Sequence, residues 1–160
     1  MLFEKEELHS IIPHRGRMLL LSRVKEYNLR EQTLEAEYDI TDDCLFYDSA
    51  LDGVPAWAGF EFIAQAISAF SGIRNRENGE SPKMGFILSV SSLRIGIPFF
   101  RAGSTAVIKT KEINRVNLVY TFEGEVLLEG VKVMEGKLTV MEINGEQAQA
   151  MKEGYQNAIT

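Results

Sequence analysis

The sequence predicts an α+β protein in which one long helix covers one face of a curved antiparallel sheet of about five to six strands. Three observations lead to this prediction. Only one long stretch, residues 56–74, combines helical periodicity with many small and apolar residues. Segments with strand-like patterns stand on both sides of it. Short turn signals, and no further long helix, separate the later segments.

The length of the chain indicates one domain. With 160 residues, of which 45% are hydrophobic, it can bury a proper core but is too short for two comfortable ones. We therefore predict a single domain over residues 1–160. Its core should occupy about residues 5–141, and residues 144–160 should form a mostly exposed tail with helical character.

The segments before the long helix are short. Residues 4–12 place their apolar side chains on one helical face, and Pro13 should end this short helix, because the residue before a proline avoids helical backbone angles. The apolar run at residues 18–24 suits a buried strand, and residues 32–40 alternate apolar and polar side chains as a half-buried strand does. The polar, turn-rich stretch 41–55 should be a surface loop that leads into the helix.

The segments after the helix read as an antiparallel meander. The predicted strands are residues 84–97, 105–113, 116–125 and 130–141. Asn114-Arg115 and Glu129-Gly130 are the predicted tight turns between the last three. One very buried helix wrapped by such a sheet is the hot-dog arrangement.

Composition excludes several classes of function. A net charge of -6 and a pI near 5.0 argue against nucleic acid as a partner. The single cysteine, Cys44, and the lack of a Cys/His cluster or glycine-rich phosphate loop leave no basis for a disulfide framework, a zinc site or a nucleotide cofactor. The acidic N-terminus is unlike a signal peptide, and no apolar run approaches the roughly 20 residues of a membrane span. We expect a cytoplasmic protein without cofactor or metal.

Two residues stand out as candidates for acid–base chemistry. Glu61 lies within the small and apolar helix, where a carboxylate loses hydration and needs a partner or a proton; it could instead lie on the one wet stripe of an amphipathic helix. His14 follows Pro13 at the end of an element, where it could serve catalysis or brace the turn. His9, on a mixed helical face, is expected at the surface.

A histidine and a glutamate that share one small site could remove a proton alpha to a thioester carbonyl and protonate a departing hydroxyl. Backbone N–H groups at the start of the long helix, around Ala56 and Trp57, could polarise the carbonyl without any special side chain.

Three motifs give the chain a resemblance to a known family. Residues 12–24 contain Pro13-His14-Arg15 followed by an apolar run that ends in Arg-Val. In residues 55–66 a proline precedes the helix and Glu61 stands three positions before Ala64-Gln65. Gly85-Phe86-Ile87-Leu88 and the Ile97-Pro98 turn complete the set. Over about residues 5–141 the chain resembles the β-hydroxyacyl-(acyl carrier protein) dehydratases of the hot-dog fold.

One departure from that family concerns the catalytic residues. The standard dehydratases carry a His-Phe-Pro-Gly segment before the helix, whereas residues 46–55 contain no histidine and place Tyr47 or Asp48 about there. The motif Pro-Ala-Trp-Ala-Gly-x-Glu-x-x-Ala-Gln resembles that of a divergent branch of the family associated with aryl polyene lipid synthesis. The resemblance therefore implies that His14 serves with Glu61 as the catalytic pair.

The resemblance also implies partners and a substrate site. It implies a homodimer or a heterodimer with a related dehydratase, helices side by side, and an acyl thioester on acyl carrier protein as substrate. The residues expected at the substrate are Ala56, Trp57, Phe60, Gln65 and Phe86, with Phe99 and Phe100 as further tunnel-wall candidates. Aromatic residues of this kind are more often plain core than tunnel wall.

Local basic clusters could receive an acidic carrier protein, or could be ordinary solvated surface. They are Arg15, Arg17 and Arg23, and Arg74, Arg76 and Lys83. Two alternatives to a dehydratase stay open from the sequence. One is an acyl thioesterase in which Glu61 activates water. The other is a non-catalytic subunit that stabilises an active dehydratase in a heterodimer.

Overall fold

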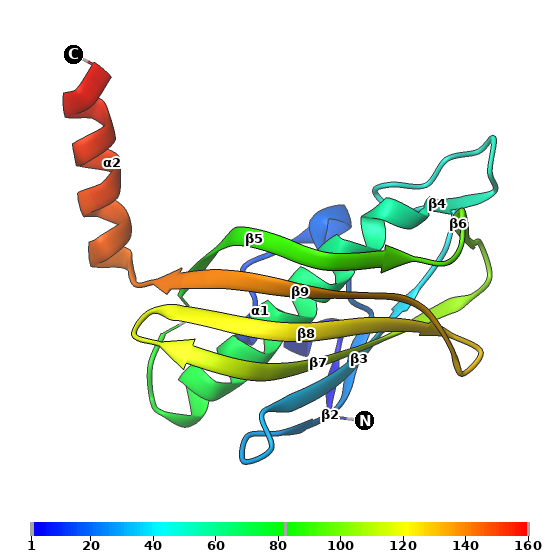
Figure 1. Ribbon diagram of the computed structural model, residues 1–160, viewed down its shortest axis with the longest axis horizontal. Helices are drawn as coiled ribbons and strands as arrows, with labels where there is room; N and C mark the ends of the chain where they lie inside the picture. Colours follow the sequence, from blue (N-terminus) through cyan, green and yellow to red (C-terminus); the bar gives the residue numbers. More distant parts are fainter. Residues whose placement is uncertain (1, 82, 160) are drawn as a thin grey trace.

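A computed structural model describes residues 2–81 and 83–159 and is built on one large sheet (Figure 1). Its seven strands follow the order β1-β2-β3-β7-β8-β9-β5, and every neighbouring pair is antiparallel. These strands are β1 (Phe3–Glu4), β2 (Arg23–Asn28), β3 (Thr33–Asp39), β5 (Met84–Ile95), β7 (Thr105–Val116), β8 (Val119–Leu128) and β9 (Val131–Ile143). The short strands β4 (Gly53–Pro55) and β6 (Phe99–Arg101) form a second small sheet.

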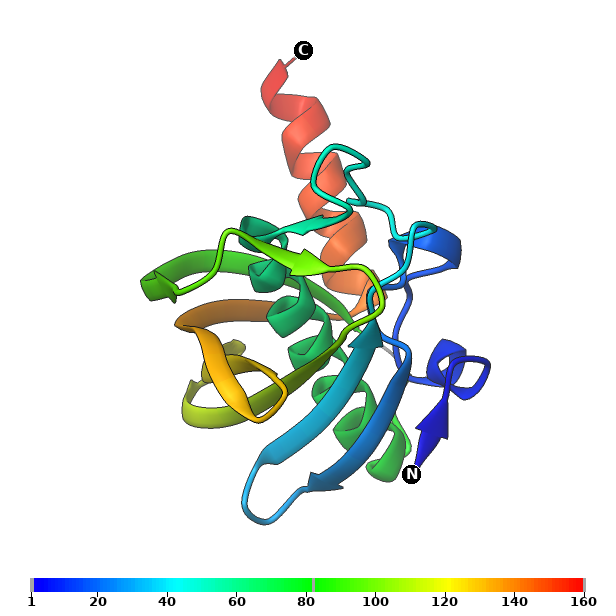
Figure 2. The ribbon, with the colours of Figure 1, turned by 90° about the vertical axis from the view of Figure 1, so that its right-hand side faces the viewer.

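The long helix α1 (Gly59–Glu77) lies against one face of the large sheet, after the 3-10 turn η3 (Ala56–Ala58) (Figure 2). The ring of Phe70 on α1 meets that of Phe122 on β8, with 6.0 Å between centroids, and burial of one such side chain contributes about 1.5–3 kcal/mol. A Cβ on Gly124 would come within 2.3 Å of the Ile63 side chain, so a glycine is needed where the helix crosses β8. The predicted α+β class is confirmed.

The sheet has seven strands where five to six were predicted, because two-residue β1 adds itself to the edge of β2. The pair β4–β6 was also not predicted. Both are three-residue strands, too short to show a repeating pattern of side chains. The pairing Val54 to Phe100 ties the start of the long helix to the chain that follows β5.

The N-terminal segment differs from its prediction in two places. Residues 4–12 contain the 3-10 helix η1 (Glu7–Ser10) and no α-helix, because Ile11 and Ile12 both donate their backbone N–H to the Leu8 carbonyl and the chain then leaves the helical path. The Ile11 backbone packs on α1 so closely that a Cβ on Gly72 would lie 1.8 Å from its carbonyl oxygen.

The strand predicted at residues 18–24 is wrong, since β2 begins only at Arg23 and the 3-10 helix η2 (Gly16–Met18) precedes the apolar run. Leu19, Leu20 and Leu21 are buried as an apolar run should be. In place of a neighbouring strand, the side-chain amide of Gln65 on α1 accepts from the Leu20 N–H and donates to the Met18 carbonyl.

The two predicted hairpin turns have different outcomes. Glu129-Gly130 is a tight turn in which both residues have positive φ, 49° and 79°, the geometry of a type I′ hairpin. The turn predicted at Asn114-Arg115 is wrong: β7 continues to Val116, and the left-handed residue is Asn117, with φ 54°. The predicted turn at Asn114 and the observed turn at Asn117 each begin with an asparagine, a residue that tolerates φ > 0. The sequence therefore did not show which of the two forms the turn.

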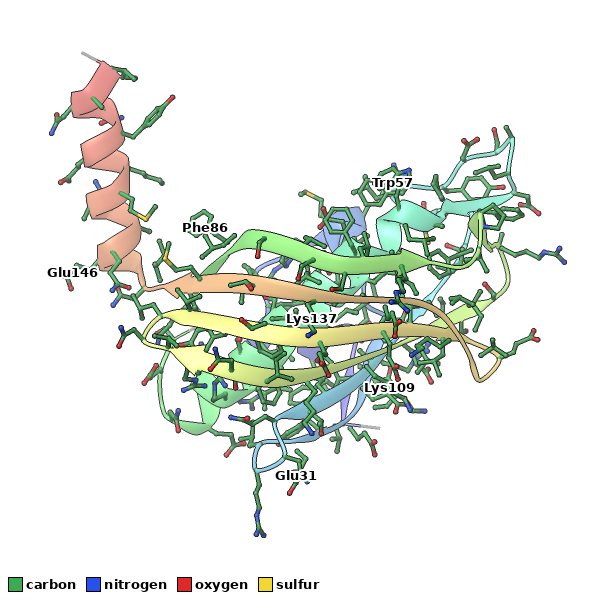
Figure 3. The ribbon with its side chains drawn as sticks, viewed as in Figure 1. Glu31, Trp57, Phe86, Lys109, Lys137 and Glu146 are labelled. Carbon is green, nitrogen blue, oxygen red and sulfur yellow. The ribbon has the colours of Figure 1, made fainter. Side chains whose placement is uncertain are left out.

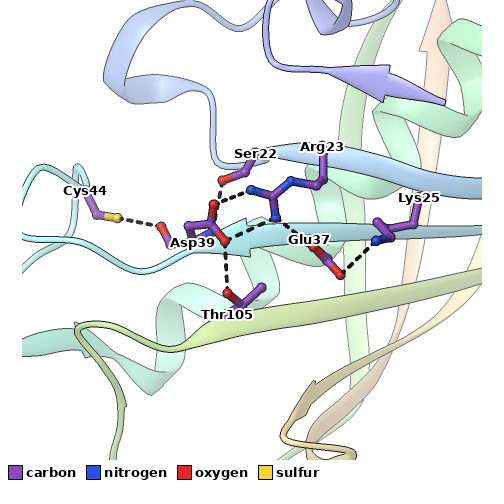
Figure 4. A network of polar contacts seen from close by, with 7 residues as sticks. All are labelled: Ser22, Arg23, Lys25, Glu37, Asp39, Cys44 and Thr105. Atoms are coloured by element: carbon purple, nitrogen blue, oxygen red, sulfur yellow. Dashed lines mark hydrogen bonds and ion pairs between the residues drawn. The ribbon is translucent and has the colours of Figure 1, made fainter. Parts of the chain in front are cut away.

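An ionic network fixes the first strands beside the N-terminal segment (Figure 4). The Arg23 guanidinium donates to Glu37 at 2.7 Å and closely contacts Asp39, and the Thr105 hydroxyl donates to Asp39 at 2.9 Å. The hydrogen bonds from Arg23 hold the pKa of Asp39 below its usual value. The network therefore joins β2, β3 and the start of β7.

The C-terminal segment is helical, as predicted for residues 144–160. It forms α2 (Gly145–Ile159), which leaves the end of β9 and has no buried residue. None of the described helices is both long and apolar enough to cross a membrane.

Candidate active site

The described chain has hollows large enough for a ligand. One, of about 850 Å³, lies on the face of the sheet turned away from α1, where Lys109 and Lys137 project (Figure 3). Many of its charges already have partners, such as Lys132 with Glu135 at 2.6 Å and Lys109 with Glu35 at 3.7 Å. The second, about 630 Å³, runs along α1 and is far richer in apolar surface. Apolar clefts with a few polar groups are the usual form of small-molecule sites.

His14 and Glu61 both line this second cavity, although 46 residues lie between them in the chain. Glu61 comes from the first turn of α1. His14 comes from the segment between η1 and η2, which lies across the same helix because Ile11 packs on Gly72. The two residues selected from the sequence as acid–base candidates are thus brought to one cavity within a single chain.

The Glu61 carboxylate is half-buried at the cavity wall and, among the described residues, has no hydrogen bond or ion pair. Its position in the first helical turn is favourable for a negative charge. Loss of hydration nevertheless dominates and raises the pKa of Glu61 above its ordinary value. The environment therefore favours a carboxyl group that holds a proton.

The pKa of His14 is shifted in the opposite direction, to below its ordinary value. Burial lowers its pKa, and the neighbouring Arg15 charge lowers it further, so the neutral imidazole is favoured. Its Nδ1 atom is buried and has no hydrogen-bond partner within the described part of the chain. Since Nδ1 is enclosed, a molecule in the cavity would have to meet the other ring nitrogen, Nε2.

Arg15 and Gln65 hold the segment that carries His14. The Arg15 guanidinium donates to the carbonyl oxygens of Ile12 at 2.7 Å, His14 at 2.9 Å and His9 at 3.0 Å. Gln65 is 4% exposed; it accepts from the Leu20 N–H at 2.7 Å and donates to the Met18 carbonyl at 2.6 Å. Gln65 lines the cavity, but both ends of its amide are engaged by the backbone; its role at a substrate stays a prediction.

The far end of the cavity is polar and was not predicted. Asn75, in the last turns of α1, donates to the buried Glu142 carboxylate of β9 at 2.6 Å. Lys83 lies nearby on the cavity wall and pairs with Glu80 at 2.6 Å. Asn75 and Glu142 are 67 positions apart, and neither belongs to a motif, so the sequence held no signal for this pair.

Of the other predicted substrate residues, one lines the cavity and three do not. Phe86 on β5 lines the cavity and is 38% exposed. Ala56, Trp57 and Phe60 do not line it within one chain. The Ala56 N–H donates to the Pro98 carbonyl, and the Trp57 ring meets that of Phe46 edge to face with 5.1 Å between centroids.

Further predicted positions also lie off this wall. Phe100 is fully buried in the core and Phe99 is half-buried. In the loop where the related family has its histidine, the Tyr47 hydroxyl donates to Asp52 at 2.7 Å, and neither Tyr47 nor Asp48 lines the cavity. Within residues 2–81 and 83–159, no group of three or more His, Cys, Asp or Glu is placed to hold a metal ion.

An imidazole with a lowered pKa and a carboxyl with a raised pKa on one apolar wall can act as a general base and a general acid. Comparison with known proteins shows similarity to a family of dehydratases. The model of the ApeP-like family, described as ApeP dehydratase, matches residues 6–153. A 3-hydroxyacyl-[acyl-carrier-protein] dehydratase FabZ from Erythrobacter litoralis is 27% identical over 142 residues, which cover 87% of this chain and 92% of that protein.

Similar solved structures have the same fold. The dehydratase heterocomplex ApeI:P from Xenorhabdus doucetiae matches with a TM-score of 0.82 and 24% identity, over 90% of this chain and 95% of that one. A phenylacetic acid degradation-related protein from Ralstonia eutropha matches with a TM-score of 0.58 and 20% identity, over 74% of this chain and 82% of that one. The predicted hot-dog fold is confirmed by these neighbours.

Proposed function

The chain belongs to the ApeP-like dehydratase family, and from that premise we propose that it removes water from a β-hydroxyacyl thioester carried on acyl carrier protein. The observation that carries the proposal is the meeting of His14 and Glu61 at one cavity, with pKa shifts of opposite direction. The similarity to a 3-hydroxyacyl-[acyl-carrier-protein] dehydratase supports the choice of substrate.

The directions of the two pKa shifts assign the roles. His14, favoured as the neutral imidazole, takes the proton from the carbon alpha to the thioester carbonyl through Nε2. The electron pair of that C–H bond becomes the new C=C bond as the β-carbon loses its hydroxyl. Glu61, favoured in the protonated form, gives its proton to the departing hydroxyl, which leaves as water. A proton returned from His14 to Glu61 through solvent completes the cycle.

The proposal includes partners. Acyl carrier protein would present the thioester, and the chain would work as a dimer with a second copy or with a related dehydratase. Phe86 supports the dimer, because it lines the cavity and also lies on the open edge of the sheet, where a partner would enclose it. The aryl polyene pathway and the cytoplasmic location remain predictions from the sequence.

The test is a spectroscopic assay for the conjugated enoyl product, with a β-hydroxyacyl thioester on acyl carrier protein as substrate. We expect Glu61→Gln and His14→Ala each to lower the turnover number by about 10²–10⁴, the usual contribution of a positioned acid or base. Glu77→Gln, on the exposed end of the same helix, and His9→Ala, an exposed histidine, are the matched controls and should retain the parent activity. Free thiol is followed in the same samples.

The second candidate function is the non-catalytic subunit. The absence of a histidine from residues 46–55 and the likeness to a dehydratase heterocomplex favour it. A folded parent protein that forms no enoyl product from a substrate that another dehydratase converts would replace the first proposal with this one. Release of thiol without enoyl product would instead indicate a thioesterase.

A further inference from the structure

The segment that carries His14 is anchored to α1 at two points. At the first, the Ile11 backbone lies so close to the helix that a Cβ on Gly72 would meet its carbonyl oxygen at 1.8 Å. At the second, the side-chain amide of Gln65 bonds to the backbone around the end of η2. The two anchors are seven positions apart on α1, which is about 10 Å of helix. Residues 12–17 connect them, and we call these residues the bridge.

One side chain holds the backbone of the bridge between its anchors. The Arg15 guanidinium donates to the carbonyl oxygens of Ile12 and His14, and also to that of His9 in η1. Among the described residues, no other side chain hydrogen-bonds to the bridge backbone. The bridge also contains Gly16 with a positive φ of 59°, a conformation that glycine adopts without steric cost. The position of His14 between the anchors therefore depends on Arg15.

The shape of an arginine side chain suits this role. A guanidinium presents five N–H donors in a fixed plane, whereas a lysine ammonium is a compact charge with three rotatable donors. In Arg15, Nη1 donates to two carbonyl oxygens at 2.7 and 2.9 Å, and Nη2 donates to a third at 3.0 Å. These three bonds tie the His14 peptide to the preceding helix η1. A lysine at this position would keep the charge and lose the fork.

Arg15 also acts on the imidazole through its charge. Burial is the larger cause of the lowered pKa of His14, and the Arg15 charge is the second cause. The other charged groups on the cavity wall are Glu61 on α1, Lys83 just before β5 and Glu142 on β9. Both causes depend on where the His14 ring lies, so a bridge that comes loose should change the titration of His14.

We propose that Arg15 is a positioning residue, which holds His14 at the cavity wall by fastening the bridge through three backbone carbonyls. It acts through His14 and makes no contact with substrate. The proposal rests on the proposed function for the reaction that it serves, but the placement of His14 can be measured without turnover. Because its donors are engaged by its own chain, Arg15 has fewer left for an acidic carrier protein, the partner considered from the sequence.

The chain has only two histidines, so proton NMR can follow the titration of His14, with His9→Ala to assign the signals. We would compare the parent with Arg15→Gln and Arg15→Lys, which should both fold because Arg15 is exposed. We expect the pKa of His14 to lie below about 6.5 in the parent and to rise toward that value in both variants. Since Arg15→Lys keeps the charge, a rise in that variant reports lost placement.

Kinetics give a second readout in the enoyl assay. A misplacement of about 1 Å can lower a rate by about 10²-fold, so we expect kcat to fall at least about tenfold in Arg15→Gln and in Arg15→Lys, with a smaller change in KM. A rise in KM at the parent kcat would assign Arg15 to carrier protein binding and overturn the proposal.

Arg17→Gln is the matched control. Arg17 is also exposed and also donates to backbone carbonyls, but these are the Asp43 and Cys44 carbonyls, both at 3.1 Å, in the loop after β3. The pKa of His14 and kcat should keep their parent values in this variant. An unchanged His14 pKa in Arg15→Lys overturns the proposal, because the charge alone would then suffice. If the parent forms no enoyl product, the dehydratase proposal fails, and the NMR titration still decides whether Arg15 positions His14.

Discussion

A carboxylate lies near each end of α1, and the two differ in whether they have an ion-pair partner. At the C-terminal end, the Glu112 side chain is 1% exposed and is held by Arg74 at 2.8 Å and Arg115 at 3.2 Å. Both guanidinium groups also lie over the Tyr120 ring, at 5.1 and 4.7 Å. At the N-terminal end, Glu61 is half-buried and has no partner among the described residues. Glu112 thus has two arginine partners, whereas Glu61 has none among the described residues.

This difference in pairing distinguishes a carboxylate with a structural role from one that could take part in proton transfer. A buried carboxylate that pairs with two arginines ties the helix to the sheet. A desolvated carboxylate without a partner has a raised pKa and costs stability when ionised. Perturbed groups of this second kind concentrate at functional sites. The comparison supports Glu61, and not Glu112, as the group that handles protons.

The largest expected effect is a loss of stability when the ion pair between Arg74 and Glu112 is removed. Arg74→Met removes the guanidinium that lies over the Phe70 ring at 5.2 Å, keeps an unbranched apolar side chain, and leaves the Glu112 carboxylate buried with Arg115 alone. Removing one partner of a buried pair costs about 3–5 kcal/mol, which for a chain of this length lowers the Tm by roughly 6–20 °C. Calorimetry measures the change. Arg76→Met, also in the last turn but exposed, should cost at most about 1 kcal/mol, and an equal loss in both variants would contradict the distinction.

A smaller effect is expected for the residue that places His14. Gln65→Met removes both hydrogen bonds to the 18–20 backbone and leaves the buried Leu20 N–H without an acceptor. One such orphaned group costs about 1–3 kcal/mol. If Gln65 positions the segment, kcat should fall while the variant stays folded at the assay temperature. Ser68→Ala, at the same cavity and on the same helix, is the control for a mere change of the wall. A variant with lower stability but the parent kcat would assign Gln65 a structural role only.

The sequence predicted the unpaired end of α1 better than the paired end. Glu61 was visible because a charge inside an apolar helical repeat violates a local pattern, and His14 because it follows a proline. No prediction was drawn from Glu112, although it lies in the inward phase of β7 with Ala106, Ile108 and Thr110. Its ion-pair partner Arg74 is 38 positions away, and local periodicity cannot reveal such a partner.

The same limit explains the errors in the fold. The long helix and the strands β3, β8 and β9 have strong periodicity and were predicted. The apolar run at 18–21 has the composition of a strand, yet a side chain of α1 supplies its hydrogen-bond partners. The Trp57 position likewise belongs to the helix start in the sequence, but it faces outward in the structure at 51% exposure. For the 18–21 run, a contact with a residue more than 40 positions away decided the outcome.

The smallest expected effect concerns the pH dependence of stability, and it has opposite signs for two carboxylates. The pKa of Glu61 is raised in the folded chain, so its ionisation favours unfolding as the pH rises above the unfolded value of about 4.3. Glu61→Gln should therefore be as stable as the parent or more stable at neutral pH, with the gain lost in acid. The pKa of Asp39 is lowered, chiefly by the hydrogen bond from Arg23, so its contribution is present above about pH 3.9 and lost as the pH falls through the lower folded pKa.

Asp39→Asn should accordingly cost about 0.5–1 kcal/mol at neutral pH, the size of a partly exposed pair, and the cost should shrink in acid. Urea unfolding of the parent and both variants at about pH 7 and about pH 3 measures the two differences. His14, whose folded pKa is lowered, titrates in every sample, and its effect cancels when each variant is compared with the parent. If Glu61→Gln lost stability at neutral pH as Asp39→Asn does, Glu61 would have a stabilising partner, and the contrast between the two ends of α1 would fail.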